Sequence, residues 1–226
     1  MKRSEINQLM RRATAFLEER SFKLPPFAYW SPGDWRERGS EADEIRECML
    51  GWDLTDFGSG DFPSIGLIMF TIRNGHNTNP EYSAKPYCEK ILIADDGQVT
   101  PMHFHWNKME DIINRGGGDL AIRLYNSTED GELSQDDVEV SIDGVLTRVK
   151  AGELVSLKPG ESICLPPGLY HEFWGEKGAV LIGEVSKVND DTVDNRFHGE
   201  IGRFPEIEED EEPLYLLFSE YPPAAE

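Results

Sequence analysis

The sequence is short of basic residues and has no long hydrophobic run. Only 22 Lys and Arg stand against 43 Asp and Glu in 226 residues, which gives a net charge of -21. A surface this negative repels nucleic acid and anionic membranes, so both are excluded as main partners. No apolar run reaches the roughly 18 residues of a membrane span. The basic residues near the N-terminus are not followed by an apolar run, so no signal peptide is expected.

Cysteine is also scarce. Cys48, Cys88 and Cys164 are far apart in the sequence and form neither a Cys-x-x-Cys pair nor an even set for disulfides. Hydrophobic residues make up 38% of the chain, which is enough for a sizeable core. These features predict a soluble, reduced, cytoplasmic protein with one large domain and extensions.

The N-terminal residues are expected to be helical. Apolar residues recur there at helical spacing behind Ser4, a candidate N-cap, and the proline-rich segment 24–26 ends this helix. Ser31, which precedes a proline, resembles a second N-cap. A second helix is expected to run from there towards Leu50, although Gly39 weakens its middle.

From Ile65 onward, the sequence changes to short apolar runs closed by turn dipeptides. Asp143-Gly144 between two such runs indicates a hairpin with a two-residue turn, and the three glycines 116–118 are interpreted as a tight turn between strands. The expected strands are residues 66–73, 89–94, 138–142, 145–149, 154–157, 162–165 and 179–185, and the third and fourth of these form the hairpin. Short strands with no helical pattern between them favour a β-sandwich or a barrel.

The predicted division has three parts. A helical extension covers residues 1–60, a β-barrel residues 61–205, and an acidic tail residues 206–226. The start of the tail, residues 206–212, is expected to be a solvated loop. The apolar segment Leu214–Phe218 is expected to pack back as an edge strand or to lie at a subunit contact.

Three of the five histidines occupy positions suited to metal binding. His103 and His105 are two residues apart in a strand-like stretch, so both rings point to one face. Glu110 follows after a short turn, and His171 comes just after a Pro-Pro-Gly turn. Three imidazoles and one carboxylate suit a first-row divalent metal and leave positions open for water or substrate. The two other histidines are interpreted as ordinary half-buried polar residues.

The spacing around these residues resembles the two cupin motifs. The first is matched in full by Gly97, five residues, His103-Phe104-His105, four residues, Glu110, six residues and Gly117. Most of the second is matched by Gly160, five residues, Pro166-Pro167-Gly168, two residues and His171. That motif usually ends in an asparagine that is not a ligand, where this chain has Gly175. The resemblance implies a mainly β fold: a cupin β-barrel with an N-terminal helical extension.

Further stretches are similar to the D-lyxose isomerases. They are Met1–Ser4, Leu24–Phe27, Thr100–Trp106, Glu110–Gly118, Gly160–His171, Gly183–Ser186 and Val188–Asp191, so the resemblance spans nearly the whole chain. It implies a manganese-dependent aldose–ketose isomerase that interconverts D-lyxose and D-xylulose, with D-mannose and D-fructose as a second pair. It also implies a homodimer and Mn²⁺ as the metal.

Such an isomerisation needs a base that moves a proton between neighbouring carbons of the sugar. Lys108 lies two residues before Glu110, so in an extended stretch it faces the metal; a solvated turn lysine is an equally good interpretation. Glu184 lies in the run 179–185, where both strand faces are apolar, so periodicity leaves its side open. The family resemblance favours the barrel interior. Lys108 and Glu184 are the predicted catalytic residues.

Four other charged residues are candidates for binding the sugar, although each type is more often found on the surface. They are Lys90, Asp190, Asp191 and Arg203.

Two other functions fit part of this pattern. A cupin dioxygenase can use the same four ligands with iron or copper, and oxygen uptake without aldose–ketose conversion would identify it. A non-enzymatic sugar-binding or storage cupin is disfavoured, because a purely structural barrel does not need four ligands around an open metal position.

Overall fold

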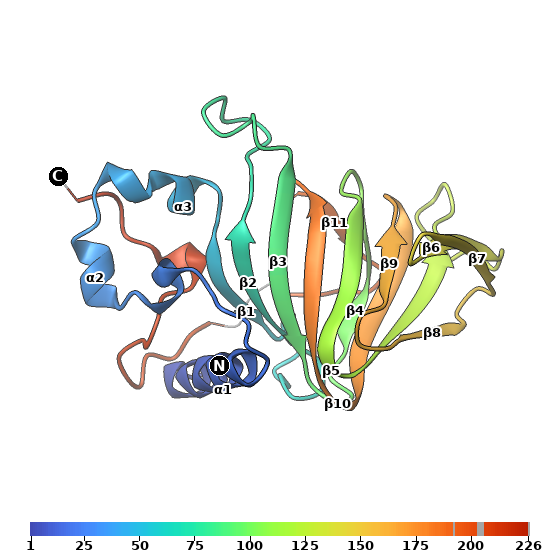
Figure 1. The fold of residues 1–226 in the computed structure, drawn as a ribbon, viewed down its shortest axis with the longest axis horizontal. Coiled ribbons are helices and arrows are strands. Elements are labelled where there is room, and N and C mark those ends of the chain that lie inside the picture. The colour runs from blue at the N-terminus through green and yellow to red at the C-terminus, as the bar shows by residue number, and fades with distance from the viewer. Residues whose placement is uncertain (192, 203–205, 226) are drawn as a thin grey trace.

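The computed structural model of the chain describes residues 1–191, 193–202 and 206–225 (Figure 1). A large curved antiparallel sheet forms the body, and short helices pack at the side where the chain begins. In these residues, no helix is long and apolar enough to cross a membrane. The predicted mainly β cupin fold with N-terminal helices is confirmed.

The helices are short except for the first. They are α1 (Arg3–Glu19), η1 (Pro26–Tyr29), α2 (Pro32–Arg36), η2 (Ser40–Ala42), α3 (Asp43–Glu47) and η3 (Phe218–Glu220), where η marks a 3-10 helix. Ser31 caps α2 as predicted, because its hydroxyl accepts a hydrogen bond from the backbone N–H of Asp34 (3.2 Å).

Two predictions for the helices are wrong. The N-cap of α1 is Lys2 rather than Ser4, and the Ser4 hydroxyl instead donates to Asp210 (2.7 Å). The single helix expected after Ser31 is interrupted at residues 37–39: α2 ends at Arg36, and Gly39 has an extended backbone (φ -84°, ψ -153°) just before η2.

The strands give the sheet its order. They are β1 (Gly51–Thr55), β2 (Leu67–Arg73), β3 (Tyr87–Ala94), β4 (Thr100–His105), β5 (Glu110–Asn126), β6 (Val138–Ile142), β7 (Val145–Val149), β8 (Leu154–Leu157), β9 (Ser162–Leu165), β10 (Leu169–Lys187) and β11 (Asn195–Phe197). Neighbours follow the order β1-β2-β3-β10-β5-β9-β6-β7, while β4 pairs with β10 and β11, and β8 with β5. The ranges predicted for β6 to β9 are confirmed, whereas β1 was not predicted. The division expected at residue 60 stays a prediction, and β1, which precedes it, pairs with β2.

The turn predicted at the three glycines 116–118 is wrong, because β5 runs through them. Gly116 and Gly117 pair with β10 across a register shift, and both have positive φ (133° and 104°). A Cβ atom on Gly117 would lie 2.1 Å from the carbonyl oxygen of Ala179. Glycine therefore permits an irregularity in which the two long strands stay paired, rather than a reversal of the chain.

Two apolar cores lie on opposite faces of the sheet. Leu92 and Ile182 belong to the core inside the barrel, whereas Ile91 and Leu181 belong to a second core shared with α1 and β1. Neighbouring residues on β3 and β10 therefore alternate between the two cores. Both faces of these strands are apolar for this reason.

The acidic residues 206–212 lie in a largely exposed loop, as expected, and this loop is attached to α1. The guanidinium of Arg3, only 1% exposed, donates to Glu209 (2.9 and 2.7 Å) and pairs with Glu220. Further along, Leu217 is buried and forms an isolated bridge with Trp52. The apolar part of the tail thus packs back on β1. It pairs with β1 through a single bridge and does not form an edge strand.

Replacing Arg3 with alanine is expected to lower the free energy of unfolding by about 1–3 kcal/mol, because it removes hydrogen bonds to two carboxylates. Urea unfolding measures this change. Arg12→Ala on the same helix is the matched control, since the Arg12 side chain is half exposed and its pair with Asp95 is expected to contribute less than about 0.5 kcal/mol. Equal losses in the two variants would contradict the anchoring role of Arg3.

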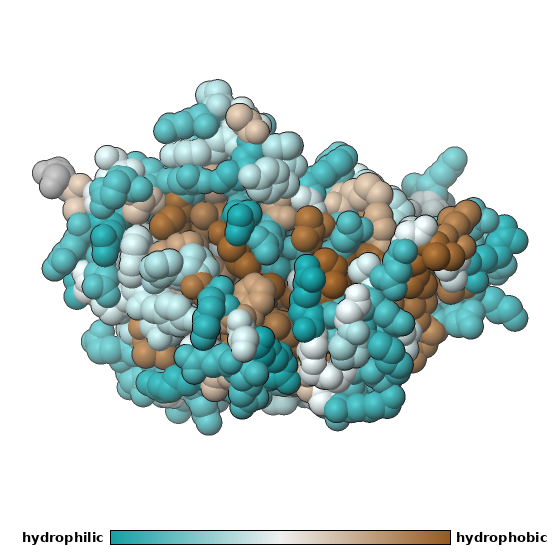
Figure 2. Space-filling model, in the orientation of Figure 1, coloured by the Kyte–Doolittle hydropathy of each residue, from teal (hydrophilic) through white to brown (hydrophobic). Residues whose placement is uncertain are grey.

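The surface reflects the charge of the chain. Figure 2 shows a largely hydrophilic face, with hydrophobic atoms in patches over its middle and in a band at the β6–β9 end of the molecule. The exposed large hydrophobic residues include Val145 and Leu146 on β7 and Leu154 on β8. This band is the part of the visible surface best suited to apolar contact.

Candidate active site

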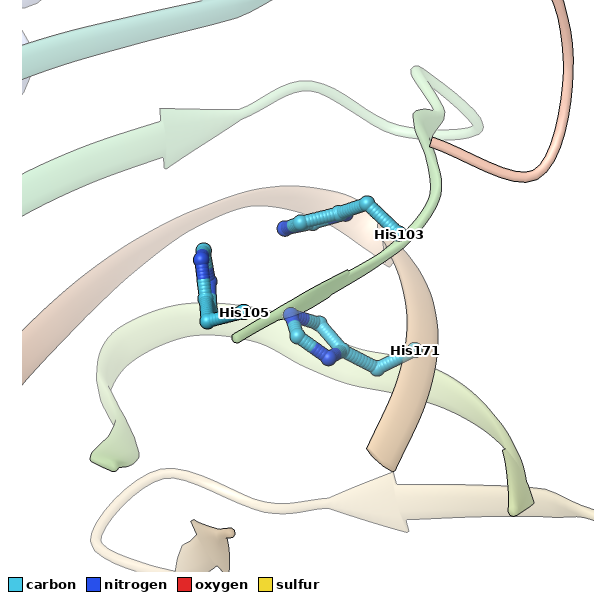
Figure 3. Close-up of side chains that lie close together, drawn as sticks. All are labelled: His103, His105 and His171. Atoms are coloured by element: carbon cyan, nitrogen blue, oxygen red, sulfur yellow. The ribbon is translucent and has the colours of Figure 1, made fainter. Parts of the chain in front are cut away.

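Three strands bring the predicted metal ligands together. β4 carries His103 and His105, β10 carries His171, and β5 begins at Glu110. His171 pairs with His103 in the register of β4 and β10, and the centroids of these rings lie 4.2 Å apart. Figure 3 shows the three imidazoles converging from the two strands. The His-x-His spacing places both β4 rings on one face, as predicted.

The three imidazoles present nitrogen atoms to one point. One ligand nitrogen from each ring lies within 4.8 Å of the other two. Each Nδ1 contacts an oxygen acceptor: Pro101 O at 2.7 Å, Asn195 Oδ1 at 2.7 Å and Leu169 O at 3.0 Å. Donation of Nδ1–H to these oxygens leaves the lone pair of each Nε2 available for a metal ion.

The surroundings of His171 fit a bound cation. Its Nε2 is buried without a hydrogen-bond partner. That nitrogen lies 3.2 Å from Glu110 Oε1, and His105 Nε2 lies 3.4 Å from the same oxygen. With Nδ1 protonated, these contacts set lone pair against lone pair, which is costly when buried unless a cation lies between them. Three imidazoles and a carboxylate therefore fit a divalent first-row metal.

The protonation state of His103 suits this role. Burial, together with the neighbouring His171 and His105 rings, lowers the pKa of His103 well below its usual value. The ring is therefore neutral at pH 7, as a metal ligand must be.

A buried network of charges adjoins the imidazoles. Lys108 Nζ lies 2.8 Å from Glu110 Oε2 and 2.8 Å from Glu184 Oε1. Lys90 Nζ lies 4.0 Å from Glu184 Oε2 and 3.2 Å from Asp191 Oδ2. Both lysines and both glutamates are 3% exposed. An unbroken chain of charged groups thus leads from Glu110 to Asp191.

The register of β10 against β3 explains why Glu184 faces inward. Ile182 pairs with Leu92, and Glu184 pairs with Lys90 two residues further along. Ile182 and Leu92 both lie in the core inside the barrel. Because side chains alternate along a strand, Glu184 and Lys90 point to the same interior.

Attraction between opposite charges holds Lys108, Glu110 and Asp191 in their charged forms. Burial disfavours the ammonium, but the carboxylates of Glu110, Glu184 and Asp191 outweigh it and raise the pKa of Lys108 well above its usual value. Burial likewise disfavours the carboxylates, yet Lys108 lowers the pKa of Glu110 and Lys90 lowers the pKa of Asp191. At neutral pH, Lys108 is a cation facing fixed negative charges.

A cavity of about 250 Å³ opens onto both the imidazoles and the charge network. Lys90, Lys108, Glu184 and Asp191 line it together with the four proposed ligands. Much of the remaining lining is apolar: Phe57, Leu67, Met69, Leu92, Ile112, Phe173, Phe197 and Ile201. A concave site with a few convergent polar groups suits a small polar molecule.

Two of the predicted sugar-binding residues are not placed at this cavity. Asp190 is half-buried and is not among the described residues that line the cavity. Arg203 lies outside the described residues. Lys90 and Asp191 are the two members of the predicted set that the structure brings to the site.

Comparison with known proteins assigns the chain to a family. The D-lyxose isomerase family matches residues 1–221. The chain belongs to this family. The D-lyxose/D-mannose isomerase of Escherichia coli O157:H7 is 48% identical over 224 residues, which cover 98% of each protein. The D-lyxose/D-mannose isomerase of Serratia proteamaculans is 49% identical over 225 residues, again 98% of each.

A solved structure shows that this member of the D-lyxose isomerase family shares its fold with another group of sugar isomerases. The L-ribose isomerase of Cellulomonas parahominis superposes with a TM-score of 0.60, covering 92% of this chain and 98% of that one. Sequence identity is 13%, so the likeness concerns the fold alone.

Several residues that support the site were not predicted from the sequence. Asn195 contacts His105 Nδ1, and the Ser186 hydroxyl donates to Glu184 Oε1 (3.0 Å). Asn189 Oδ1 accepts from Lys108 Nζ (3.1 Å). Amide and hydroxyl side chains are common at surfaces, so neither composition nor periodicity singles them out. For Asn189 and Asn195, the one available indication was that both lie in the polar segment that follows β10.

Proposed function

We propose that this chain is a metal-dependent aldose–ketose isomerase that interconverts D-lyxose and D-xylulose, with D-mannose and D-fructose as a second pair. Its membership of the D-lyxose isomerase family supports the choice of sugars. The observation that carries the reaction type is the 2.8 Å contact of Lys108 with both Glu110 and Glu184. This contact joins a metal centre and a proton-transfer pair within one cavity, and aldose–ketose isomerisation requires both.

The metal is proposed to be Mn²⁺, held by His103, His105, Glu110 and His171. When bound, the ion polarises the sugar carbonyl and stabilises negative charge on the sugar oxygens. The Nδ1 contacts of the histidines keep each Nε2 oriented towards the ion.

Glu184 is the proposed base. It removes the proton from C2 of the aldose and returns it to C1, so that the ketose forms through an enediolate. The Lys108 ammonium, 2.8 Å from Glu184, stabilises the developing negative charge or moves the hydroxyl proton. Because the pKa of Lys108 is raised, this donor is in place before the reaction begins.

Lys90 and Asp191 are proposed to bind sugar hydroxyls. They form a 3.2 Å pair on the cavity lining, which presents one donor and one acceptor. Asp190 and Arg203 stay predictions for the same role.

The site favours isomerisation over the two other functions. A dioxygenase needs open positions on a metal but no buried lysine–glutamate pair beside it. A sugar-binding protein without activity needs neither open positions on a metal nor a buried lysine–glutamate pair. Burying Lys108 and Glu184 at 3% exposure costs free energy, which a catalytic role explains.

We also propose that the protein is a cytoplasmic homodimer. All three cysteines are free, which suits a reducing compartment. The exposed Val145, Leu146 and Leu154 provide apolar area for a contact between copies.

Chelation is expected to abolish ketose formation, and Mn²⁺ is expected to restore it better than Zn²⁺. The donors are imidazole and carboxylate, and no cysteine is among the described residues that line the cavity, so no thiolate favours a softer ion. The measurement supplies metal-free protein with each ion and a panel of aldopentoses and aldohexoses, and follows the ketose. Full activity of metal-free protein would exclude a metal-dependent reaction, and oxygen uptake without ketose would favour the dioxygenase.

A further inference from the structure

The turn between β4 and β5 joins two proposed metal ligands and carries Lys108. The backbone N–H groups of three consecutive residues in it donate to one residue, Asp194. Trp106 N donates to the main-chain oxygen (2.9 Å), Asn107 N to Oδ1 (2.8 Å) and Lys108 N to Oδ2 (2.9 Å). The side-chain amide of Asn107 also donates to Oδ1 (3.0 Å). A single side chain therefore holds the backbone from which the lysine projects.

Asp194 is itself fixed in place. It is 7% exposed, and its backbone N–H donates to Asp190 O (3.1 Å). The next residue, Asn195, pairs with His105 in the register of β11 and β4, and its side chain contacts His105 Nδ1 (2.7 Å). Asn195 thus holds the ring of a proposed metal ligand, and Asp194 separately holds the backbone of the proton-transfer lysine.

The hydrogen bonds from the turn to the Asp194 side chain require two acceptor oxygens. Oδ1 faces the N–H of Asn107, and Oδ2 faces the N–H of Lys108. An asparagine has one acceptor oxygen and one NH₂ donor, so whichever way it is turned, it sets a donor against a donor. A change from aspartate to asparagine keeps the shape but leaves a backbone N–H of the turn without its acceptor.

We propose that Asp194 is a positioning residue for the reaction. It holds residues 106–108 so that Lys108 Nζ stays 2.8 Å from both Glu110 and Glu184. A misplacement of about 1 Å in such a group can cost roughly 10²-fold in rate. Asp194 therefore acts on turnover through the Lys108 ammonium, while His105 keeps its own contact with Asn195. The inference rests on the proposed isomerase function.

The test is a double-mutant cycle on the metal-loaded enzyme. Asp194→Asn is expected to lower kcat by about 10–10²-fold, with KM changed by less than about 3-fold and with metal content unchanged. Lys108→Met is expected to lower kcat and to keep the metal. In the Lys108→Met background, Asp194→Asn should change kcat by less than about 2-fold, because the group that it positions is gone. A residue that only maintains the fold would give the same loss in both backgrounds.

Asp143→Asn is the matched control. Asp143 Oδ1 also accepts from a backbone N–H, that of Ser162 (2.8 Å), but it lies in the turn between β6 and β7 and does not line the cavity. This variant is expected to keep the wild-type kcat. If Asp194→Asn does not fold, Asn107→Ala replaces it, because the 3.0 Å bond to Asp194 is the only hydrogen bond that the exposed Asn107 side chain makes to the described residues. It should give a smaller kcat loss that again vanishes with Lys108→Met.

Three results would overturn the proposal: a wild-type kcat in Asp194→Asn, equal losses in the two backgrounds, or loss of metal in step with loss of kcat. A wild-type kcat in Asn107→Ala would do the same where that variant is used. Failure of the wild-type enzyme to form any ketose would instead overturn the proposed function, so the two failures are distinguishable.

Discussion

His103→Ala and His171→Ala are each expected to lose bound metal and at least about 10³-fold in turnover, since a metal ion contributes several kcal/mol to stabilising the transition state. Both rings converge on one point with Nδ1 engaged by a backbone oxygen. Alanine removes one ligand and leaves a buried carboxylate facing the remaining imidazoles. Metal analysis after dialysis, together with initial rates of ketose formation, measures both effects.

His76→Ala is the matched control for these variants. His76 Nδ1 accepts from the backbone N–H groups of Thr78 (3.1 Å) and Asn79 (2.9 Å) in a loop, and His76 does not line the cavity. This variant is expected to keep both metal and turnover. If His103→Ala or His171→Ala kept activity with stoichiometric metal, the replaced residue would not be a ligand.

Glu184→Gln is expected to keep the metal and a normal fold but to lose about 10²–10⁴-fold in isomerisation, the usual contribution of a general base. Glutamine has the same size, and its amide oxygen can still accept from Ser186 Oγ, which lies 3.0 Å from Glu184 Oε1. It cannot take up the sugar proton. Initial rates on D-lyxose and D-mannose, with metal content checked, measure the loss.

The same substitution at Glu139 provides the control. Glu139 lies on β6, and its exposed carboxylate pairs with Arg148 (2.9 Å). Glu139→Gln is expected to leave turnover unchanged. Near-normal turnover in Glu184→Gln would move the base to Asp190, Asp191 or Lys90 and would leave the isomerase proposal standing.

The parts of the site that follow from the sequence are those set by short-range geometry. His103 and His105 share a face because two residues on a strand always do, and motif spacing placed Glu110 and His171 beside them. The side of Glu184 could not be decided from the pattern, because a second core with α1 makes the outer face of β10 apolar as well. Only the pairing of β10 with β3 resolves it.

Long-range hydrogen bonds account for most of what the sequence could not predict. Asp194 reaches Lys108 across 86 positions, and Arg3 reaches Glu209 across 206. Nothing in the local pattern distinguishes these carboxylates from the many solvated ones in a chain with 43 acidic residues. The same limit explains why the sequence does not indicate the attachment of the acidic loop to α1. The strand β1 was missed although its residues from Trp52 to Thr55 alternate between apolar and polar, because the strand has only five residues and directly follows the segment expected to be helical.

The most direct test of base-mediated isomerisation follows the sugar proton. Metal-loaded wild-type enzyme is supplied with D-lyxose in D₂O, and the ketose is analysed for deuterium at C1. If Glu184 carries the proton from C2 to C1, some of it exchanges with solvent during transfer, so D-xylulose should form with deuterium at C1. D-xylulose formed without any deuterium would contradict a base that exchanges with solvent, and would leave either a proton transfer shielded from solvent or a metal-assisted hydride shift between the two carbons.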